Sequence, residues 1–225
     1  MHTPSIGIIG TGWVGASVAI SVLQAGAAQE VLLFDTRDGL AEGEAMDLAH
    51  GAAFYPSAQV RAGSLAEMLD TQAIVITAGK GGTPGQSRLD LLKENLGILR
   101  NIALQLRGYQ GIVVIVSNPI DVLVFDFTQA SGLPPERVIG TGTMLDTARL
   151  RQMLGQQLAL DPRSIHAQLV GEHGDSEVVL WSSAEVGGVP LRSWAGWQPA
   201  DEEQMAHQVR RAAYEIIQRK GTTNH

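Results

Sequence analysis

Short apolar runs alternate with amphipathic segments in the first part of the chain. Four such runs, rich in β-branched residues and too short for helices, cover residues 6–9, 31–34, 73–77 and 112–116. Their apolar positions are continuous rather than alternating, which predicts strands buried on both faces within a parallel sheet. Between them, apolar residues at helical spacing predict helices over residues 13–25 and 41–53, the first ending at Gly26 and the second before Pro56.

Strands that alternate with helices in this way connect through right-handed crossovers, so we expect an α/β fold with a doubly wound parallel sheet over residues 1–142. After Gly142 the pattern changes and predicts a smaller α+β domain over residues 143–225. Its expected elements are a helix at 146–158, a strand at 165–170, an apolar stretch at 178–186 and a polar-faced helix at 201–219.

Composition narrows the class of protein. Of the 225 residues, 44% are hydrophobic and 17% are charged, a balance that excludes intrinsic disorder. With 16 basic and 23 acidic residues the net charge is −7, which argues against a nucleic-acid partner. No apolar run reaches the roughly 18 residues of a membrane span, and there is no cysteine for thiol chemistry or a thiolate metal site. We therefore expect a globular protein of the cytoplasm without a membrane partner.

A glycine-rich turn joins the first predicted strand to the first predicted helix. It consists of Gly10, Thr11, Gly12, Trp13, Val14 and Gly15. In a Rossmann-type dinucleotide site these glycines allow a tight turn and close approach of a pyrophosphate, which the free amides at the helix start would hold. Asp35 ends the next strand 20 residues after Gly15, where a carboxylate accepts ribose hydroxyls and repels a 2′-phosphate. The pattern favours NAD over NADP; the alternatives are a turn without a ligand and an ordinary strand-end aspartate.

Four later segments carry polar residues that packing alone does not explain. They are TAGKGGTPGQSR (77–88), SNPID (117–121), DTAR (146–149) and GEHGD (171–175). The first is a glycine-rich loop that ends in Arg88 before an apolar helix, so it can close over a ligand and deliver a guanidinium. The second follows a strand at the sheet edge where parallel sheets bind ligands. Taken singly, each has an ordinary alternative, such as a surface ion pair between Asp146 and Arg149.

In this order, the motifs GTGWVG, TAGKGGTPGQSR, SNPID, GTGTMLDTAR and GEHGDS resemble those of the NAD-dependent L-lactate and malate dehydrogenase family. The resemblance runs along the whole chain and is closest to bacterial L-lactate dehydrogenases. It implies an oxidoreductase that uses NAD to transfer a hydride to or from a small 2-oxo or 2-hydroxy acid.

The resemblance also implies a role for each polar residue. His173 would be the general acid and base, a task suited to a side chain with an unperturbed pKa of ~6.5, and Asp146 would hold its ring. Arg149 would clamp the substrate carboxylate through two parallel hydrogen bonds. Arg88 would polarise the carbonyl group, and Asn118 would donate a hydrogen bond near the same oxygen.

The remaining site residues follow from the same resemblance. Thr223 would line the substrate pocket. The implied cofactor-binding residues outside the glycine turn and Asp35 are Thr77, Ala78, Gly79 and Asn118. The histidines outside these motifs lack ligand spacing, so we expect no metal site.

Gly82 leaves the choice of 2-oxo acid open. It occupies the loop position that largely sorts substrates in this family, usually glutamine in lactate enzymes and arginine in malate enzymes. Because Gly82 supplies no cation for a second carboxylate, malate is disfavoured. Glycine makes room for a larger side chain, so lactate does not follow from this position alone.

Arg151 and His166 match the positions at which allosteric bacterial L-lactate dehydrogenases bind fructose 1,6-bisphosphate across a two-fold subunit interface. We expect a homo-oligomer, a tetramer or a dimer, that binds this effector. The alternative is an exposed helix arginine and a partly buried histidine without a shared ligand.

Family members continue beyond the position of Thr223 with further helices and strands. We therefore expect a truncated substrate domain in which apolar side chains of residues 178–186 are left uncovered. Two alternatives to an L-lactate dehydrogenase stay open, a dinucleotide-binding remnant without catalysis and a malate dehydrogenase.

Overall fold

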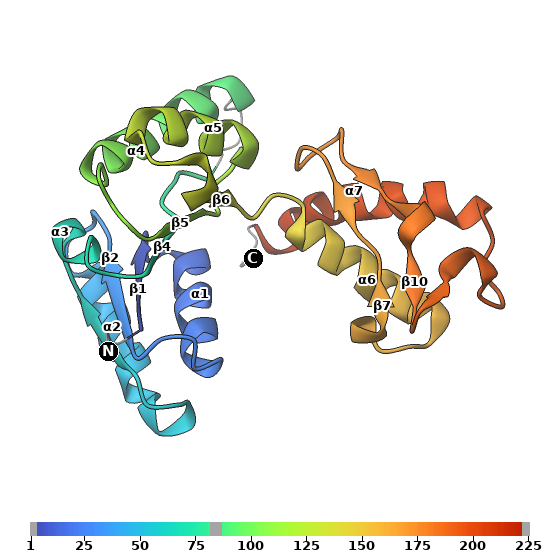
Figure 1. The fold of residues 1–225 in the computed structure, drawn as a ribbon, viewed down its shortest axis with the longest axis horizontal. Coiled ribbons are helices and arrows are strands. Elements are labelled where there is room, and N and C mark those ends of the chain that lie inside the picture. The colour runs from blue at the N-terminus through green and yellow to red at the C-terminus, as the bar shows by residue number, and fades with distance from the viewer. Residues whose placement is uncertain (1–3, 82–86, 222–225) are drawn as a thin grey trace. The chain divides into compact units, whose positions relative to one another are not determined.

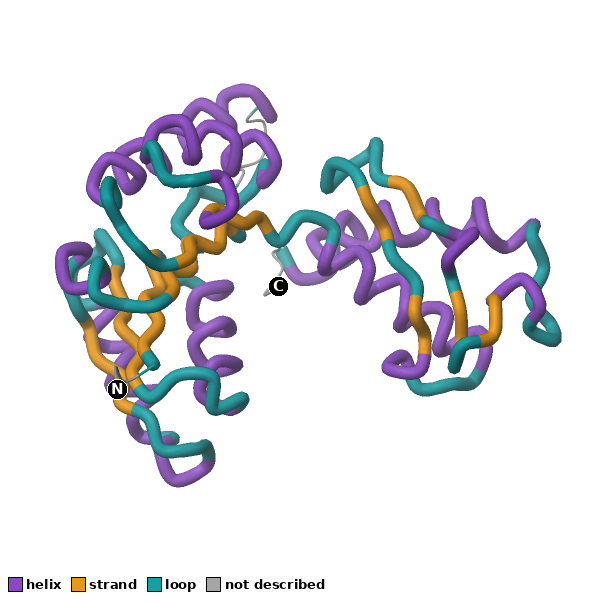
Figure 2. The backbone as a smooth tube through the Cα atoms, viewed as in Figure 1, coloured by secondary structure: helices purple, strands orange, loops and turns teal. Residues whose placement is uncertain are grey.

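The structure, a computed structural model, describes residues 4–81 and 87–221, and of Arg88 only the backbone. Contacts within the chain divide it into two compact units, one ending at Gly140 and the other beginning at Thr141. The first is called the N-terminal unit and the second the C-terminal unit (Figures 1 and 2).

A six-stranded parallel sheet forms the centre of the N-terminal unit, in the order β3-β2-β1-β4-β5-β6. Its strands are β1 (Ser5–Ile9), β2 (Glu30–Phe34), β3 (Gln59–Ala62), β4 (Ala73–Ile76), β5 (Ile112–Ile115) and β6 (Val138–Gly140). The order reverses between β1 and β4, which places the switch point of the sheet at the carboxyl ends of these two strands. The predicted doubly wound parallel sheet is confirmed.

Helices cover both faces of this sheet (Figure 1). They are α1 (Trp13–Gln24), α2 (Leu40–His50), α3 (Leu65–Met68), α4 (Arg88–Gln105) and α5 (Ile120–Ser131). Helices α1 and α2 pack on one face around Leu23 and Leu33, whereas α3, α4 and α5 pack on the other around Leu99 and Phe127. Since the sheet is buried on both sides, its strands need apolar residues at successive positions, and this explains the continuous apolar runs.

Several parts of the N-terminal unit differ from the sequence-based prediction. Helix α2 ends at His50 rather than at residue 53, because the chain tightens into a 3-10 turn over Ala52–Phe54 and the Tyr55 hydroxyl donates to the Leu48 carbonyl. Strands β3 and β6 and the short helix α3 were not predicted. Strand β3 is a half-exposed edge strand whose sequence, QVRA, carries no apolar run, and β6 has only three residues.

In the C-terminal unit, two helices pack against small antiparallel sheets (Figure 2). The helices are α6 (Met144–Leu158) and α7 (Ala200–Lys220), and the strands are β7 (Ile165–His166), β8 (Leu169–Val170), β9 (Val178–Val179), β10 (Glu185–Val186) and β11 (Val189–Pro190). The single strand expected at 165–170 was wrong, since β7 pairs with β10 and β8 pairs with β9. Between β7 and β8 the Ala167 carbonyl accepts a hydrogen bond from the Arg151 side chain.

Short 3-10 turns complete the connections, at Ala52–Phe54, Pro135–Arg137, Pro162–Ser164, Trp181–Ser183 and Leu191–Ser193. Within the described ranges, 4–81 and 87–221, no helix combines the length and the apolar character that crossing a membrane would need.

The apolar stretch at 178–186 packs into the core of the C-terminal unit. Val179, Ala184 and Val186 are 8%, 2% and 4% exposed, and Val178 is 56% exposed. The expectation that this stretch is uncovered was therefore wrong for three of these four side chains. Leu150 of α6 and Val209 of α7 belong to the same core, so these helices supply the cover that we expected from later strands.

Candidate functional site

The glycine turn between β1 and α1 has no room for side chains at two of its three glycines. A Cβ on Gly15 would lie 1.9 Å from the Gly10 carbonyl oxygen, and one on Gly10, where φ is +93°, would lie 2.7 Å from the Ala78 amide nitrogen. Gly12 differs, because an added Cβ would meet only the Arg37 guanidinium, at 3.8 Å. Gly10 and Gly15 thus close the turn on the sheet, while Gly12 faces open space at the start of α1.

The first turn of α1 offers its amides to a ligand. Gly12 is the N-cap residue, no side chain caps the helix, and no acidic residue lies in the first turn. Trp13 is 71% exposed, and Val14 beside it is half-buried. Backbone N–H groups at a helix start carry partial positive charge, so this turn can bind an anion.

The end of β4 is bonded to both of its neighbours in the sheet. The Thr77 hydroxyl donates to the Gly10 carbonyl at 2.7 Å, and the Ser117 hydroxyl donates to the Ala78 carbonyl at 2.6 Å. Gly79 lies against the side chains of Ser117 and Asn95. The segment from Thr77 to Gly79 is thus bonded to the glycine turn on one side and to the SNPID turn on the other.

Asn95 is a site residue that the sequence-based prediction missed. Its side chain, 1% exposed on α4, accepts from the Lys80 amide at 2.8 Å and donates to the Asn118 carbonyl at 2.8 Å. It therefore ties the start of the glycine-rich loop to the SNPID turn. The only available signal was a polar residue at an inward-facing position of an apolar helix.

Asn118 lies at the carboxyl end of β5, as predicted, and is exposed. Its side-chain oxygen accepts a hydrogen bond from the Ile120 amide at 3.3 Å, at the start of α5. Because the oxygen is used in this way, the side-chain amide nitrogen is the group that it can offer to a ligand.

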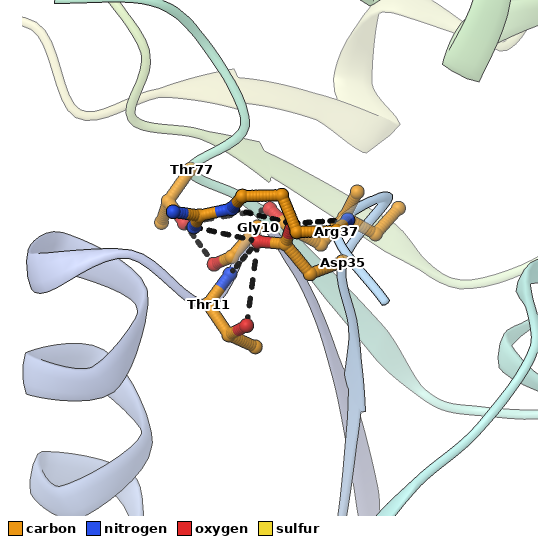
Figure 3. Close-up of polar contacts among 6 residues, drawn as sticks. Gly10, Thr11, Asp35, Arg37 and Thr77 are labelled. Carbon is orange, nitrogen blue, oxygen red and sulfur yellow. Dashed lines mark hydrogen bonds and ion pairs between the residues drawn. The ribbon is translucent and has the colours of Figure 1, made fainter. Parts of the chain in front are cut away.

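Asp35 lies beside the glycine turn and is bonded to it (Figure 3). Its carboxylate accepts from the Thr11 amide at 2.8 Å and from the Thr11 hydroxyl at 3.3 Å. Arg37 closes over the same carboxylate, with Nε 3.1 Å from Oδ1 and Nη2 3.2 Å from Oδ2. Burial opposes the charge of Asp35, but the hydrogen bonds from Arg37 and Thr11 outweigh it and lower the pKa to about 2.

A hollow of about 370 Å³ opens beside Asp35. Its lining includes Asp35, Arg37, Asp38, Glu42 and Ser64. Three of these five side chains are acidic and one is basic, so the hollow favours neutral hydroxyls over a phosphate dianion.

In the C-terminal unit, two threonines at the start of α6 hold this helix to β8. The Thr143 hydroxyl donates to the Leu169 carbonyl at 2.7 Å, and the Leu169 amide donates to the Thr147 hydroxyl at 3.0 Å. The first turn of α6 carries Asp146, and the loop between β8 and β9 carries His173. These two bonds therefore set the position of the carboxylate relative to the imidazole.

Asp146 lies between His173 and Arg149. Its Oδ2 is 2.5 Å from Nδ1 of His173, and its Oδ1 accepts from Nη1 of Arg149 at 2.8 Å. The carboxylate side chain is 3% exposed, the guanidinium 14% and the imidazole 27%. The structure thus brings the three residues together, with the imidazole the most accessible of the three. The contact of Asp146 with His173 is the expected one, whereas an ion pair between Asp146 and Arg149 was considered only as a surface alternative and is buried here.

The pKa shifts of this group follow from its contacts. The hydrogen bond to Asp146 raises the pKa of His173, even though burial opposes the charged imidazolium. Burial would raise the pKa of Asp146, but the hydrogen bond and charge of His173, together with Arg149, hold it below its ordinary value. The pair therefore favours an ionised carboxylate beside a protonated imidazole.

Glu177 is a second residue that the sequence-based prediction missed. It is 3% exposed and lies just before β9, close to Asp146 and His173. The signal in the sequence was an acidic residue directly before the apolar run Val178-Val179-Leu180.

Arg151 lines a hollow to which His166 does not contribute. Arg151 lines a hollow of about 530 Å³ together with Thr147 and Arg163, and its Nε donates to the Ala167 carbonyl at 3.0 Å. His166 is exposed on β7, opposite Glu185 of β10, and does not line that hollow.

Three predicted substrate contacts fall wholly or partly outside the described residues. Gly82 and Thr223 lie outside them, and of Arg88 only the backbone, at the first position of α4, is described.

The comparison with family models covers nearly the whole chain. Residues 5–140 match the NAD binding domain of lactate/malate dehydrogenases, and residues 143–225 match their alpha/beta C-terminal domain.

Individual relatives agree with that result. The L-lactate dehydrogenase of Geobacillus kaustophilus is 43% identical over 97% of this chain and 71% of its own length. The L-lactate dehydrogenase of Moorella thermoacetica is 44% identical over 98% of this chain and 72% of its own. This chain therefore spans a little over two thirds of these relatives.

Solved structures give the same picture. A minor L-lactate dehydrogenase from Enterococcus mundtii superposes with a TM-score of 0.94 at 43% identity, over 98% of this chain and 73% of that one. The malate dehydrogenase of Picrophilus torridus superposes with a TM-score of 0.91 at 32% identity, over 99% of this chain and 71% of that one. With both family models matched and the Asp146–His173 pair in place, the chain belongs to the lactate/malate dehydrogenase family.

Proposed function

We propose that this chain is an NAD-dependent L-lactate dehydrogenase that interconverts L-lactate and pyruvate. The observation that carries the proposal is the bonded group of Asp146, His173 and Arg149 in a chain whose curated relatives are L-lactate dehydrogenases. The alternative of a remnant without catalysis is not favoured, because the described residues include a complete acid–base pair and its arginine.

The N-terminal unit fits a dinucleotide. Gly12 leaves open space at the uncapped start of α1, where a pyrophosphate would accept hydrogen bonds from the backbone. The Asp35 carboxylate would accept the hydroxyls of the adenosine ribose, in place of the side-chain bonds that Arg37 now makes. Thr77, Ala78, Gly79 and Asn118 would line the remainder of the cofactor site. When bound, NADH supplies the hydride for the reduction.

In the C-terminal unit, His173 would hold the proton that the reaction needs. Asp146 accepts a hydrogen bond from Nδ1 of His173. Nε2 is therefore the atom that donates its proton to the carbonyl oxygen of pyruvate. In the reverse direction the same nitrogen accepts the hydroxyl proton of L-lactate. The ionised Asp146 stabilises the imidazolium between these steps, as in other carboxylate–imidazole pairs.

Arg149 would bind the carboxylate of the substrate. One of its nitrogens, Nη1, is committed to Asp146, and this bond fixes the plane of the guanidinium. The rest of the fork can then form parallel hydrogen bonds to a carboxylate. Arg88 would polarise the carbonyl, Asn118 would donate to the same oxygen, and Thr223 would line the pocket.

Lactate is favoured over malate by two observations. The L-lactate dehydrogenases named above are 43–44% identical to this chain, whereas the named malate dehydrogenase structure is 32% identical. Gly82 supplies no cation for a second carboxylate. Substituting Gly82→Arg should therefore raise the rate with oxaloacetate and lower the rate with pyruvate.

The direct experiment follows NADH oxidation with pyruvate and with oxaloacetate as separate substrates. The proposal predicts turnover with pyruvate, L-lactate as the product and a higher kcat/KM for pyruvate. The matched control is His173→Asn, which should bind NADH normally and lose turnover. Faster turnover with oxaloacetate would instead support a malate dehydrogenase.

Fructose 1,6-bisphosphate is a proposed effector, and its support is that Arg151 lines a hollow together with a second arginine. The proposed assembly is a cytoplasmic homo-oligomer, a tetramer or a dimer. Its support is the exposure of two large apolar side chains, Met46 at 62% and Phe54 at 89%. The measurement is light scattering and pyruvate turnover with and without the bisphosphate. Arg151→Gln should abolish any activation, and activation that survives this change would remove the effector site from the proposal.

A further inference from the structure

Glu177 lies beside Asp146 and His173 and takes no part in the proton transfer proposed for that pair. Potential ligand atoms of Asp146, His173 and Glu177 all lie within 4.8 Å of one another. Glu177 is 3% exposed, and its Oε1 is buried without a hydrogen-bond partner among the described residues. A buried carboxyl oxygen in this state is costly if the group is ionised.

Among the described residues, the charges around Glu177 include no dedicated counter-ion. From α6, Asp146 faces it with a negative charge, and Arg149 is committed to Asp146 at 2.8 Å. His173, in the same loop, also faces Glu177. The exposed Arg210 of α7 lowers the pKa of Glu177, but less than His173 does. A carboxyl group in such surroundings keeps its proton more readily than one in water.

We propose that Glu177 is a positioning residue that shares a proton with Asp146 and thereby sets the pH range over which His173 holds its own proton. This rests on the proposed function of His173 as the acid and base. While protonated, Glu177 donates a hydrogen bond to the Asp146 carboxylate and adds no charge. When its proton leaves for solvent, a second negative charge faces the imidazolium and stabilises it.

The pKa shifts agree with this geometry. Burial, followed by the negative charge of Asp146, raises the pKa of Glu177 to about 7, against the opposing charges of His173 and Arg210. The Glu177 charge in turn contributes to the raised pKa of His173, after the larger effect of the Asp146 hydrogen bond. The titrations of Glu177 and His173 are therefore linked.

Two carboxylates and an imidazole are also common ligands of a divalent metal ion, so binding of such an ion is the alternative use of these three side chains. The hydrogen bond from Arg149 to Asp146 argues against that use, because it places a permanent positive charge where a cation would bind. Proton sharing needs no such cation.

The test is an NMR titration of the His173 imidazole in the full 225-residue chain, with the resonance assigned by its absence in His173→Asn. Glu177→Gln keeps a donor for Asp146 but can never become negative. We expect it to lower the His173 pKa by about one unit. An unchanged pKa would overturn the proposal.

Glu172→Gln is the matched control, since Glu172 lies in the same loop but is exposed and accepts a hydrogen bond from Ser176. It should leave the His173 titration within about 0.2 units of the wild type, because solvent screens its charge. A shift as large as that of Glu177→Gln would show a general charge effect and overturn the specific role of Glu177.

The pH profile of pyruvate reduction provides a second readout. Glu177→Gln should move the alkaline limb of kcat/KM to lower pH by the same amount as the NMR shift. An NMR shift in a chain without turnover would count against the proposed dehydrogenase activity alone. Turnover with an unmoved pH profile and an unmoved imidazole would count against Glu177 alone.

If Glu177→Gln does not fold, infrared spectroscopy of the unaltered chain tests the same idea. A buried protonated carboxyl band should disappear with a midpoint near pH 7. Its absence at mildly acidic pH would show that Glu177 is already ionised and would overturn the proposal.

Discussion

The two units each contain an aspartate bonded to an arginine, and the two pairs differ mainly in exposure. In the N-terminal unit the Asp35 side chain is 8% exposed and its partner Arg37 is 64% exposed. In the C-terminal unit the Asp146 side chain is 3% exposed and its partner Arg149 is 14% exposed. An aspartate–arginine ion pair therefore lies at the surface of one unit and in the interior of the other.

This difference decides what each pair can do. Arg37 can leave Asp35 at little cost, because an exposed ion pair contributes less than about 1 kcal/mol, and a ribose can then take its place. Arg149 cannot leave Asp146 without stranding a buried charge, so it holds its plane ready for a substrate carboxylate. We infer that a ligand can replace Arg37 at Asp35, whereas Arg149 stays bonded to Asp146 during catalysis.

The largest effect should come from neutralising the buried aspartate. Asp146→Asn removes the group that stabilises the imidazolium, so kcat for pyruvate should fall by about 10³- to 10⁴-fold. Asp35→Asn is the matched change in the other unit and should raise the KM for NADH while leaving kcat within a few-fold. Steady-state kinetics with both substrates varied would measure this, and equal losses of kcat in the two variants would break the comparison.

Replacing each arginine by lysine tests the same contrast with the charge retained. Arg149→Lys loses the planar fork, so kcat/KM for pyruvate should fall by about 10- to 100-fold, the loss of one or two charge-assisted hydrogen bonds. Arg37→Lys should change the KM for NADH by less than about fivefold. A mild effect at Arg149 would mean that this arginine does not clamp the substrate.

The pH dependence of folding should have opposite signs in the two units. Glu177 has its pKa raised from 4.5 to about 7, so its contribution to the free energy of unfolding is full below pH 4.5 and is lost as the pH rises through 7. Asp35 has its pKa lowered from 3.8 to about 2, so its contribution is present above pH 3.8 and is lost as the pH falls through 2.

Denaturant titrations across pH would measure both signs. Between pH 4.5 and 7, Glu177→Gln should remove a slope of up to about 1.4 kcal/mol per pH unit, the linkage of one proton. Asp35→Asn should not change the slope in that range. An unchanged slope for Glu177→Gln would mean that this carboxyl is not buried as a neutral acid.

The smallest effect is expected from removing the exposed arginine. Arg37→Ala frees the Asp35 carboxylate for ribose hydroxyls, so NADH should bind about two- to fivefold more tightly at low salt, with the difference fading as salt is added. Fluorescence titration with NADH measures this affinity. Weaker binding in the variant would show that Arg37 contacts the cofactor instead of competing with it.

Local sequence patterns predicted much of the fold and of the site for identifiable reasons. The parallel strands are continuous apolar runs, and Gly10 and Gly15 occupy positions where a Cβ would collide with backbone or side-chain atoms. His173, Asp146 and Arg149 lie in ordered motifs, and the bonds between α6 and β8 bring them into contact.

What the sequence did not predict depends on contacts between distant segments. Asn95 acts through bonds to residues 15 and 23 positions away, and Glu177 acquires its character only once Asp146, 31 positions earlier, lies beside it. Strands β7 and β8 were predicted as one strand, because two residues are too few to show an alternation of apolar and polar positions. Arg37 was missed because nothing in a local pattern shows that a guanidinium folds back onto a carboxylate two residues earlier.

The proposed dehydrogenase activity of His173 is tested most directly by the stereochemistry and substrate preference of NADH oxidation by this chain, measured beside His173→Asn. We expect pyruvate to be reduced to L-lactate with a higher kcat/KM than oxaloacetate, and the variant to bind NADH without turnover. Turnover that survives in His173→Asn, or NADH binding by the unaltered chain without reduction of pyruvate, would contradict the proposed activity.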